Sequence, residues 1–440
     1  MEIKENPILK IAIPSIVSNI TVPLLGLVDM AITGHLGNSA YIGAISLGGM
    51  LFNLCYWLFT FLRMGTGGLT SQAFGAGNNR EITLILARTQ ALSLLVSFLL
   101  IAFHEKLLQV AFNYISSSPE VESLSATYFR ILIWGAPAVL CLYSFTGWFL
   151  GMQDARVPMV IAIVQNIVNI AASLFFVTVL HWKIEGVAIG SLVAQYSGLV
   201  MAICFWKRKY WKNAAKISLG EVCEGKALKK LFNVNRDIFL RTLCIICVTT
   251  FFTSAGARQG NSILAANAIL MQFFFMFSYV MDGFAYAGEA LSGRYMGACD
   301  SNSFRDNSKK LFCWGLWLST FATVLYALMA RPFLHALTDE AGIIETAQSY
   351  LFYVVCIPYA SFAAFLLDGI FIGTTSTKQM LVGMSVAAAM FFAVYFLLEN
   401  LLGNHALWIA FLSYLFFRGL VQSLFYGKIA AKVKRPQSQS

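Results

Sequence analysis

Long uninterrupted runs of apolar residues constrain this chain more than any other feature. Each is about 20 residues long, the length that a helix needs to cross the hydrocarbon core of a bilayer, and none alternates as a barrel strand does. Hydrophobic residues make up 58 % of the 440 and charged residues 12 %, whereas soluble domains have about 45–50 % and about 25 %. A soluble enzyme and a disordered chain are therefore excluded. The sequence predicts an all-α integral membrane protein.

Hydropathy predicts twelve transmembrane helices. Their ranges are 8–33, 41–62, 82–103, 124–150, 157–180, 185–206, 237–257, 263–288, 311–330, 344–373, 380–402 and 405–427. The spans 124–150 and 344–373 exceed the bilayer thickness, so we expect them to tilt or to project beyond it.

The basic residues predict the orientation of these spans. Residues 207–236 (the basic segment) contain nine Lys and Arg against two acids, and four more basic residues follow the last span. Because positive loops stay on the cytoplasmic side, we expect both termini and the basic segment to be cytoplasmic, in the inner (plasma) membrane. The net charge of +10 thus reflects topology rather than binding of nucleic acid.

The two halves of the chain resemble each other at a shift of about 222 residues. The matching pairs are Gly37–Ser39 with Gly260–Ser262, Ala73–Ala76 with Tyr295–Ala298, and Gly147–Gly151 with Gly369–Gly373. Six spans per half predict parallel repeats, which place a substrate path between two lobes. We expect an N-lobe at 1–206, a C-lobe at 237–427 and a tail at 428–440, with a central cleft between two six-helix lobes related by a pseudo-twofold axis.

Asp29 is the clearest ionisable residue inside an apolar span. Such a residue costs roughly 2.5–3.5 kcal/mol at mid-membrane depth and is by default a functional candidate. Pro14 and Pro23 lie on the same span, and each removes a backbone donor and permits a bend. We interpret Asp29 as a group that binds and releases the coupling ion. The alternative is a structural carboxylate that accepts hydrogen bonds from hydroxyls such as Thr33.

Two asparagines of the fifth span offer further polar groups. Asn166 and Asn169 are three residues apart and share a helix face. Their amides can bond Asp29 or supply oxygens to a cation. They can equally hold neighbouring helices together.

The second half carries a different set of ionisable residues. Asp282 and Glu289 share a face of the eighth span, and Asp368 lies in the tenth. Arg241 can pair with Asp282 or Asp368, so these residues are either part of ion coupling or a structural ion network. The repeat places Phe252 opposite Asp29 and Thr146 opposite Asp368, so we expect any ion coupling to be asymmetric.

Aromatic and methionine side chains crowd the eighth span. Among them, Phe277 and Met281 would suit a cavity for large amphipathic or cationic substrates. Both residue types also commonly face lipid, which is the alternative.

Four segments resemble a known family. They are Asn19–Gly26, Val28–Gly37, Asn235–Thr242 and Leu367–Gly373. Together they are similar to the multidrug and toxic compound extrusion (MATE) transporters, and most of all to the DinF-like branch, over essentially the whole chain.

The resemblance implies alternating access and export of organic, often cationic, compounds in exchange for protons or sodium. It makes Asp29 the coupling acid of the first helix, Pro14 the proline at which that helix bends, and Asn169 a neighbour of the acid. Ser173 stands where many members have an aspartate, which weakens a two-carboxylate site and favours protons.

The predicted function is therefore a secondary antiporter, proton-coupled in preference to sodium-coupled. No nucleotide-binding loop is found in the sequence, and the five histidines have no metal-ligand spacing. Cys244 and Cys247 have redox or metal spacing, but they lie in an apolar run without a partner pair, so we interpret them as core residues. We therefore expect no cofactor and no enzyme activity. The expected partners are small organic substrates and the lipid bilayer, with the chain acting as a monomer. The alternatives are a flippase or exporter of a lipid-linked or metabolite substrate, and a membrane enzyme acting on lipids.

Overall fold

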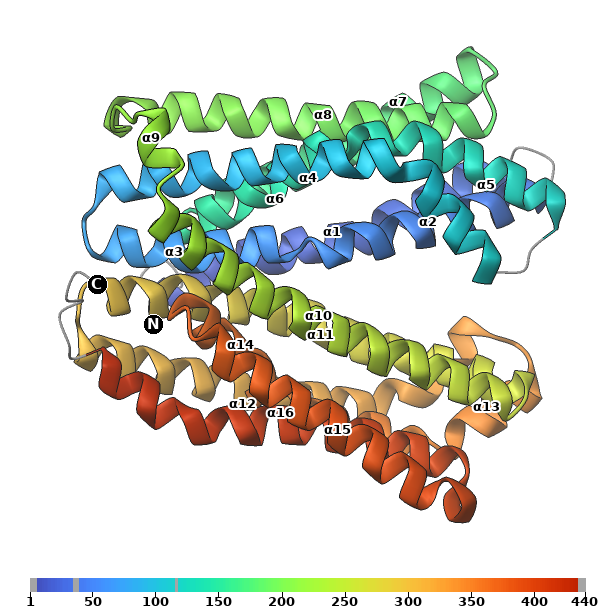
Figure 1. Cartoon of the computed structure of the whole chain (residues 1–440). Helices are drawn as coiled ribbons and strands as arrows, with labels where there is room; N and C mark the ends of the chain where they lie inside the picture. The colour runs from blue at the N-terminus through green and yellow to red at the C-terminus, as the bar shows by residue number, and fades with distance from the viewer. Residues whose placement is uncertain (1–5, 35–38, 115–117, 434–440) are drawn as a thin grey trace. The chain divides into compact units, whose positions relative to one another are not determined.

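The computed structural model describes residues 6–34, 39–114 and 118–433, and these are almost entirely helical (Figure 1). In this described part, eleven helices are long and apolar enough to cross a membrane, and Pro7–Thr21 forms a shorter apolar helix segment. The prediction of an all-helical membrane protein is confirmed. Gly37 and Asn38 of the repeat, and Lys434 and Arg435 of the tail, lie outside the described residues.

Each predicted span coincides with one or more helices. The first half contains α1 (Pro7–Gly34), α2 (Ser39–Leu58), α3 (Phe61–Gly75), α4 (Asn79–Tyr114), α5 (Pro119–Leu132), η1 (Ile133–Gly135), α6 (Ala136–Gly151), α7 (Arg156–Leu174), η2 (Phe175–Val179) and α8 (Ile184–Lys209). The basic segment contains η3 (Trp211–Asn213) and α9 (Leu219–Val222), and it leads into α10 (Gly225–Arg258). The second half continues with α11 (Asn261–Gly297), α12 (Ser301–Leu337), α13 (Ala341–Gln348), α14 (Leu351–Gly373), α15 (Thr377–Leu402) and α16 (Asn404–Lys432).

Several helices differ from the predicted ranges. The helix predicted at 237–257 begins at Gly225, because Ala, Leu and Lys favour helix and continue it into the polar region. The two long spans are interrupted, at Ile133–Gly135 and at residues 349–350, so each is two helices rather than one long rod. α1 continues as one helix through Pro14 and Pro23.

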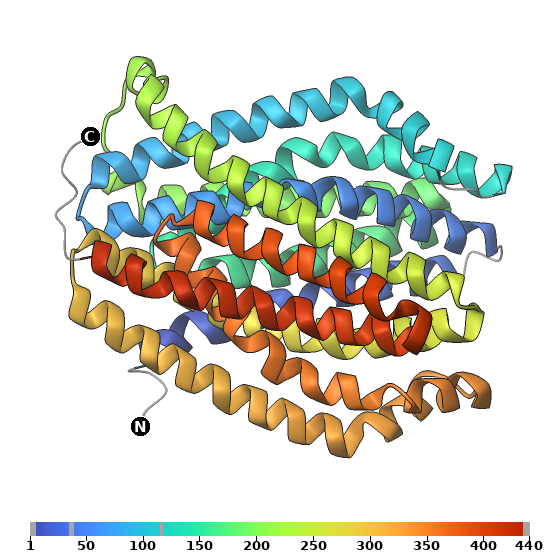
Figure 2. The ribbon, with the colours of Figure 1, turned by 60° about the horizontal axis from the view of Figure 1, so that its bottom comes forward.

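The helices form two compact units. Val17–Phe232 is the first unit, and Asn233–Ser440 together with the chain up to Ile16 is the second. The first unit thus includes most of the basic segment. Within the second unit α15 and α16 lie side by side, as the red end of the ribbon shows (Figure 2).

The repeat predicted from the sequence is visible in how each unit packs its helices. A Cβ added to Gly147 of α6 would lie 2.1 Å from the carbonyl oxygen of Arg63 in α3. A Cβ added to Gly369 of α14 would lie 2.1 Å from the carbonyl oxygen of Ala285 in α11. Both partners of the second pair follow those of the first by 222 residues. These small residues let the two backbones touch in each unit, as in membrane helix pairs generally.

The turns repeat as well. Left-handed backbone (positive φ) occurs at matching corners of the two halves. The pairs are Gly77 with Cys299, Gln153 with Thr375, and His181 with Gly403. Each pair is again 222 residues apart, so both halves turn at the same places.

Candidate functional site

Asp29 lies near the end of α1 and is buried, with 8 % of its surface exposed. In the part of the chain that the structure describes, its Oδ1 accepts no hydrogen bond. The Thr33 hydroxyl, a predicted partner of the carboxylate, donates instead to the main-chain carbonyl of Asp29. The acid is therefore held in place by its helix and not by a fixed donor on Oδ1.

Three further helices bring polar side chains to Asp29. Tyr128 of α5 interacts electrostatically with Asp29 and forms a hydrogen bond with Ser191 of α8. The amide nitrogen of Asn169 in α7 donates to the Ser191 hydroxyl at 2.8 Å. We call Asp29, Tyr128, Asn169 and Ser191 the Asp29 cluster. It links the predicted pair Asp29 and Asn169 through two residues that the sequence did not single out.

Two buried polar atoms in or next to the Asp29 cluster have no hydrogen-bond partner. Neither the amide oxygen of Asn169 nor the hydroxyl of Ser173 has a hydrogen-bond partner among the described residues, although both are buried. Helices α7 and α8 approach closely here, because a Cβ added to Gly190 would lie 2.3 Å from the Ser173 hydroxyl oxygen. Buried polar atoms without partners also occur elsewhere in the described residues, at Tyr56, Thr70 and Asn307 for example, so they do not by themselves mark this cluster as a site.

Asn166 is not part of this cluster. Its amide nitrogen donates to the main-chain carbonyl of Thr21 in α1 at 3.0 Å. The interpretation of Asn166 as a residue that joins neighbouring helices is therefore the one that the geometry supports. Pro23 lies two residues further along α1 and is partly buried, and Pro14 is buried.

The second unit contains a buried ion network around Asp368 of α14. Arg241 of α10 and Arg418 of α16 both donate to its Oδ2, and Gln422 donates to its Oδ1 at 2.6 Å. The side chains of Asp368 and both arginines are only 6 % exposed. We call these four residues the Asp368 network. Of the two partners predicted for Arg241, the structure selects Asp368.

Other acids of the second unit have different surroundings. Asp282 is partly buried and interacts electrostatically with Arg418. Glu289 is buried within α11, and its main-chain carbonyl packs against Gly373. Phe277 and Met281 are buried inside their unit, so neither faces lipid. The ring of Phe277 contacts that of Phe365, with centroids 6.5 Å apart.

The sequence reasoning missed Arg418 and Gln422. Both lie inside the apolar span 405–427, where the rule that singled out Asp29 also applies. It also missed a second polar cluster, in which Asn267 and Asn404 exchange hydrogen bonds of 2.8 and 2.9 Å and Trp408 donates to Asn267.

In the described residues, no three His, Cys, Asp or Glu side chains lie close enough together to hold a metal ion. The nine cysteines are free thiols, Cys244 and Cys247 included.

Comparison with known proteins identifies the family. The MatE family model matches residues 14–175 and again residues 238–398, which together are more than half of the chain and reproduce the repeat. The chain is 35 % identical to DNA damage-inducible protein F of Escherichia coli K12 over 410 residues, covering 93 % of this chain and 89 % of the relative. It is 26 % identical to multidrug and toxin extrusion protein 1 of Danio rerio, covering 95 % of this chain and 70 % of the relative.

Solved structures share the fold. A MATE protein crystallised in a bent conformation superposes with a TM-score of 0.85 at 17 % identity, covering 97 % of this chain and 95 % of the other. An outward-facing MATE-family multidrug resistance transporter superposes with a TM-score of 0.84 at 18 % identity, covering 98 % and 96 %. The chain therefore belongs to the MATE family of multidrug and toxin extrusion transporters, and it is not an enzyme.

Proposed function

We propose that this transporter is a cation-coupled antiporter that uses protons in preference to sodium. It exports organic, often cationic, compounds by alternating access of two lobes, 1–206 and 237–427, around a central cleft. The basic segment, the tail 428–440 and both termini lie in the cytoplasm, and the chain works as a monomer in the inner membrane.

The contrast between two buried acids carries the proposal. Asp368 is held by two arginines and a glutamine, so a cation could reach it only by breaking those bonds. Asp29 forms no ion pair in the described part of the chain, and its Oδ1 has no donor. A buried charge without a partner is costly, and binding a proton removes that charge. Asp29 is therefore better placed than Asp368 to load and unload an ion.

The composition of the Asp29 cluster favours protons. Asp29 is the single carboxylate of the cluster, whose other members are neutral, and Ser173 replaces the second acid that many members of the family have. The unpartnered oxygens of Asn169 and Ser173 are neutral, so Asp29 is the one charged ligand offered to a cation here, whereas a proton needs only one carboxyl oxygen. Tyr128 interacts electrostatically with Asp29, and Ser191 joins Tyr128 to Asn169.

Coupling follows from these positions. A proton that enters from outside neutralises Asp29, and the neutral cluster repacks the part of α1 that contains Pro23. The repacking releases the exported compound, and loss of the proton to the cytoplasm restores the starting state. Pro14, where the resemblance places the bend of this helix, permits that movement because its helix bond to residue 10 is missing.

Transport into proteoliposomes under an imposed proton or sodium gradient tests the proposal. The proton gradient should drive uptake of organic cations, and Asp29→Asn should abolish it although the protein inserts normally. Asp306→Asn is the matched control, because Asp306 is exposed and pairs only with Lys310 on the same helix. Wild-type transport by Asp29→Asn would refute the role of Asp29, and uptake driven by sodium alone would refute the choice of ion.

The alternative of a lipid-linked or other anionic substrate requires cationic side chains that are free to bind it. Arg241 and Arg418 are the buried cations of the second unit that could do so, and both bind Asp368. Because Asp368 already neutralises these two arginines, they are not free to bind an anionic substrate. This favours the antiporter of organic cations over an exporter of anionic substrates. Including organic anions in the same transport panel separates the two functions.

A further inference from the structure

A pocket of about 550 Å³ lies in the first unit, beside the basic segment. Its walls are α4, α6, the end of α8 and residues 211–217. Leu86, Phe145, Trp206 and Ile217 give it a mainly apolar lining. The volume is within the range of about 300–1,000 Å³ that small-molecule sites occupy.

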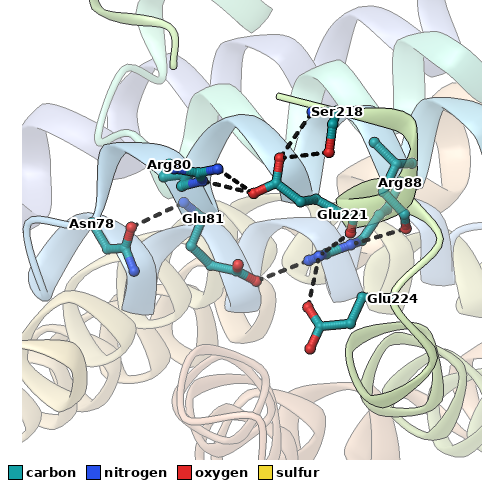
Figure 3. Close-up of polar contacts among 8 residues, drawn as sticks. Asn78, Arg80, Glu81, Arg88, Ser218, Glu221 and Glu224 are labelled. Carbon is teal, nitrogen blue, oxygen red and sulfur yellow. Dashed lines mark hydrogen bonds and ion pairs between the residues drawn. The ribbon is translucent and has the colours of Figure 1, made fainter. Parts of the chain in front are cut away.

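The basic segment is held against α4 by a set of ion pairs and hydrogen bonds (Figure 3). The Arg88 side chain is 3 % exposed and donates to the main-chain carbonyls of Glu221 and Val222 at 2.8 and 3.3 Å. Arg80 binds the Glu221 carboxylate, and Glu224 lies 3.7 Å from Arg88. We call these contacts the Arg88 clasp. The clasp fixes residues 221–224, which follow the wall residues 211–217. The hydrogen bonds therefore hold this wall of the pocket in place.

The polar groups of the pocket are occupied by the protein. The Thr83 hydroxyl accepts from the Ala215 amide at 3.2 Å and donates to the Asn79 carbonyl at 2.9 Å. Gln90 donates to the Cys141 carbonyl at 3.1 Å. Lys216 is the charged residue among those that line the pocket, and it is exposed. The pocket therefore offers an apolar interior with one cation at its rim.

The charge around the pocket selects an anionic occupant. The two acids of the basic segment are engaged by Arg80 and Arg88, and Lys209 pairs with Asp154, whereas Lys216 at the pocket forms no ion pair among the described residues. Trp211, Leu219 and Phe232 of the same segment are exposed apolar side chains. Lysines interspersed with exposed aromatic and aliphatic residues are typical of a segment at the membrane surface. A cationic drug would be repelled here, whereas a lipid with a negative headgroup would be attracted.

We propose that this pocket binds an acyl chain of an anionic phospholipid, whose phosphate contacts Lys216. The bound lipid fills the space between α4, α6 and α8 and joins the basic segment to the bilayer. The site is separate from the Asp29 cluster and does not depend on which ion or substrate is transported.

Native mass spectrometry of the purified full-length protein tests this. The protein is mixed with equal amounts of dioleoyl phosphatidylglycerol and dioleoyl phosphatidylcholine, and the retained lipids are counted. We expect phosphatidylglycerol to be retained preferentially. Lys216→Gln should weaken its retention about fivefold, the effect of one lysine near a lipid surface, whereas Lys226→Gln, an exposed lysine outside the pocket, should not.

A second variant tests the pocket itself. Ala87 lines the pocket, so Ala87→Trp fills it and should remove the preference for phosphatidylglycerol. Ala102→Trp, on an exposed face of the same helix, should keep it. Equal retention of the two lipids, equal losses in the two lysine variants, or unchanged retention in Ala87→Trp would each overturn the proposal. Displacement of phosphatidylglycerol by an organic cation would instead assign the pocket to transported substrates and also overturn it.

Discussion

Replacing Asp368 with asparagine tests whether the Asp368 network holds the second unit together. The change keeps the shape of the side chain and removes its charge. Arg241 and Arg418 then remain buried, with 6 % of each side chain exposed and without the carboxylate that both contact. Asp282, which interacts with Arg418, is the remaining acid described near them, and it compensates only in part.

The size of the effect follows from these contacts. Removing one partner of a buried ion pair costs about 3–5 kcal/mol, because an uncompensated charge is left behind. Counting only the two arginine hydrogen bonds to Oδ2 gives a similar figure, since each hydrogen bond to a charged group contributes about 1.5–3 kcal/mol. We therefore expect Asp368→Asn to lower the free energy of unfolding by about 3–5 kcal/mol. Adding Arg418→Gln should recover about 0.5–3 kcal/mol, because one of the two stranded cations is gone.

Unfolding in mixed micelles by SDS titration measures this change. The intrinsic fluorescence of the nine tryptophans, which include the fully buried Trp408 of the second unit, follows the transition. Asp306→Asn serves as the control and should stay within about 0.5 kcal/mol of the wild type, because Asp306 and Lys310 are both exposed. The reasoning is refuted if Asp368→Asn is also within that range, or if Arg418→Gln makes Asp368→Asn less stable.

Three further predictions concern packing and turns. Gly369→Ala should destabilise the protein by about 1–3 kcal/mol in the same titration, because its Cβ would overlap the Ala285 carbonyl; Gly220→Ala, which meets no atom within 4 Å, should not. Arg88→Ala should speed tryptic cleavage of the basic segment about thirtyfold, because it removes roughly 2 kcal/mol of hydrogen bonding. Arg80→Ala, at an exposed residue, should have a smaller effect. Equal cleavage rates in the two variants would contradict the role of the Arg88 clasp. Thr375→Gly should raise the midpoint of unfolding, because a β-branched residue at φ 51° is strained; a lower midpoint would show that its side chain matters more than its backbone.

The sequence predicts the spans well because each depends on local composition. Twenty apolar residues leave a helix as the one structure that satisfies its own backbone in lipid, so the existence of each helix needs no tertiary information. Helix ends are different. α10 begins at Gly225 although its first residues are polar, because helix propensity and capping continue a helix past the apolar run.

Partners of buried side chains were harder to predict, because they depend on which helices pack together. The sequence offered Arg241 two acids, and only the contact between its side chain and that of Asp368 in the folded chain decides between them. It gave no reason to connect Asp29 with Asn169 through Tyr128 and Ser191, since the four lie on four helices. Arg418 could have been found from the sequence, because a charge in the middle of an apolar span is a local signal.

The matching corners of the two halves have a consequence for how this chain can change. Between Gly77 and Gln153, and between Cys299 and Thr375, the number of residues is the same. One inserted or deleted residue in a helix would turn every later side chain by about 100° and move it to another face. Equal counts therefore keep the corners in register between the two halves, although the helices between them are interrupted at different places, Ile133–Gly135 and residues 349–350. Exchanging equivalent segments between the halves would therefore keep these corners at the same positions along the chain.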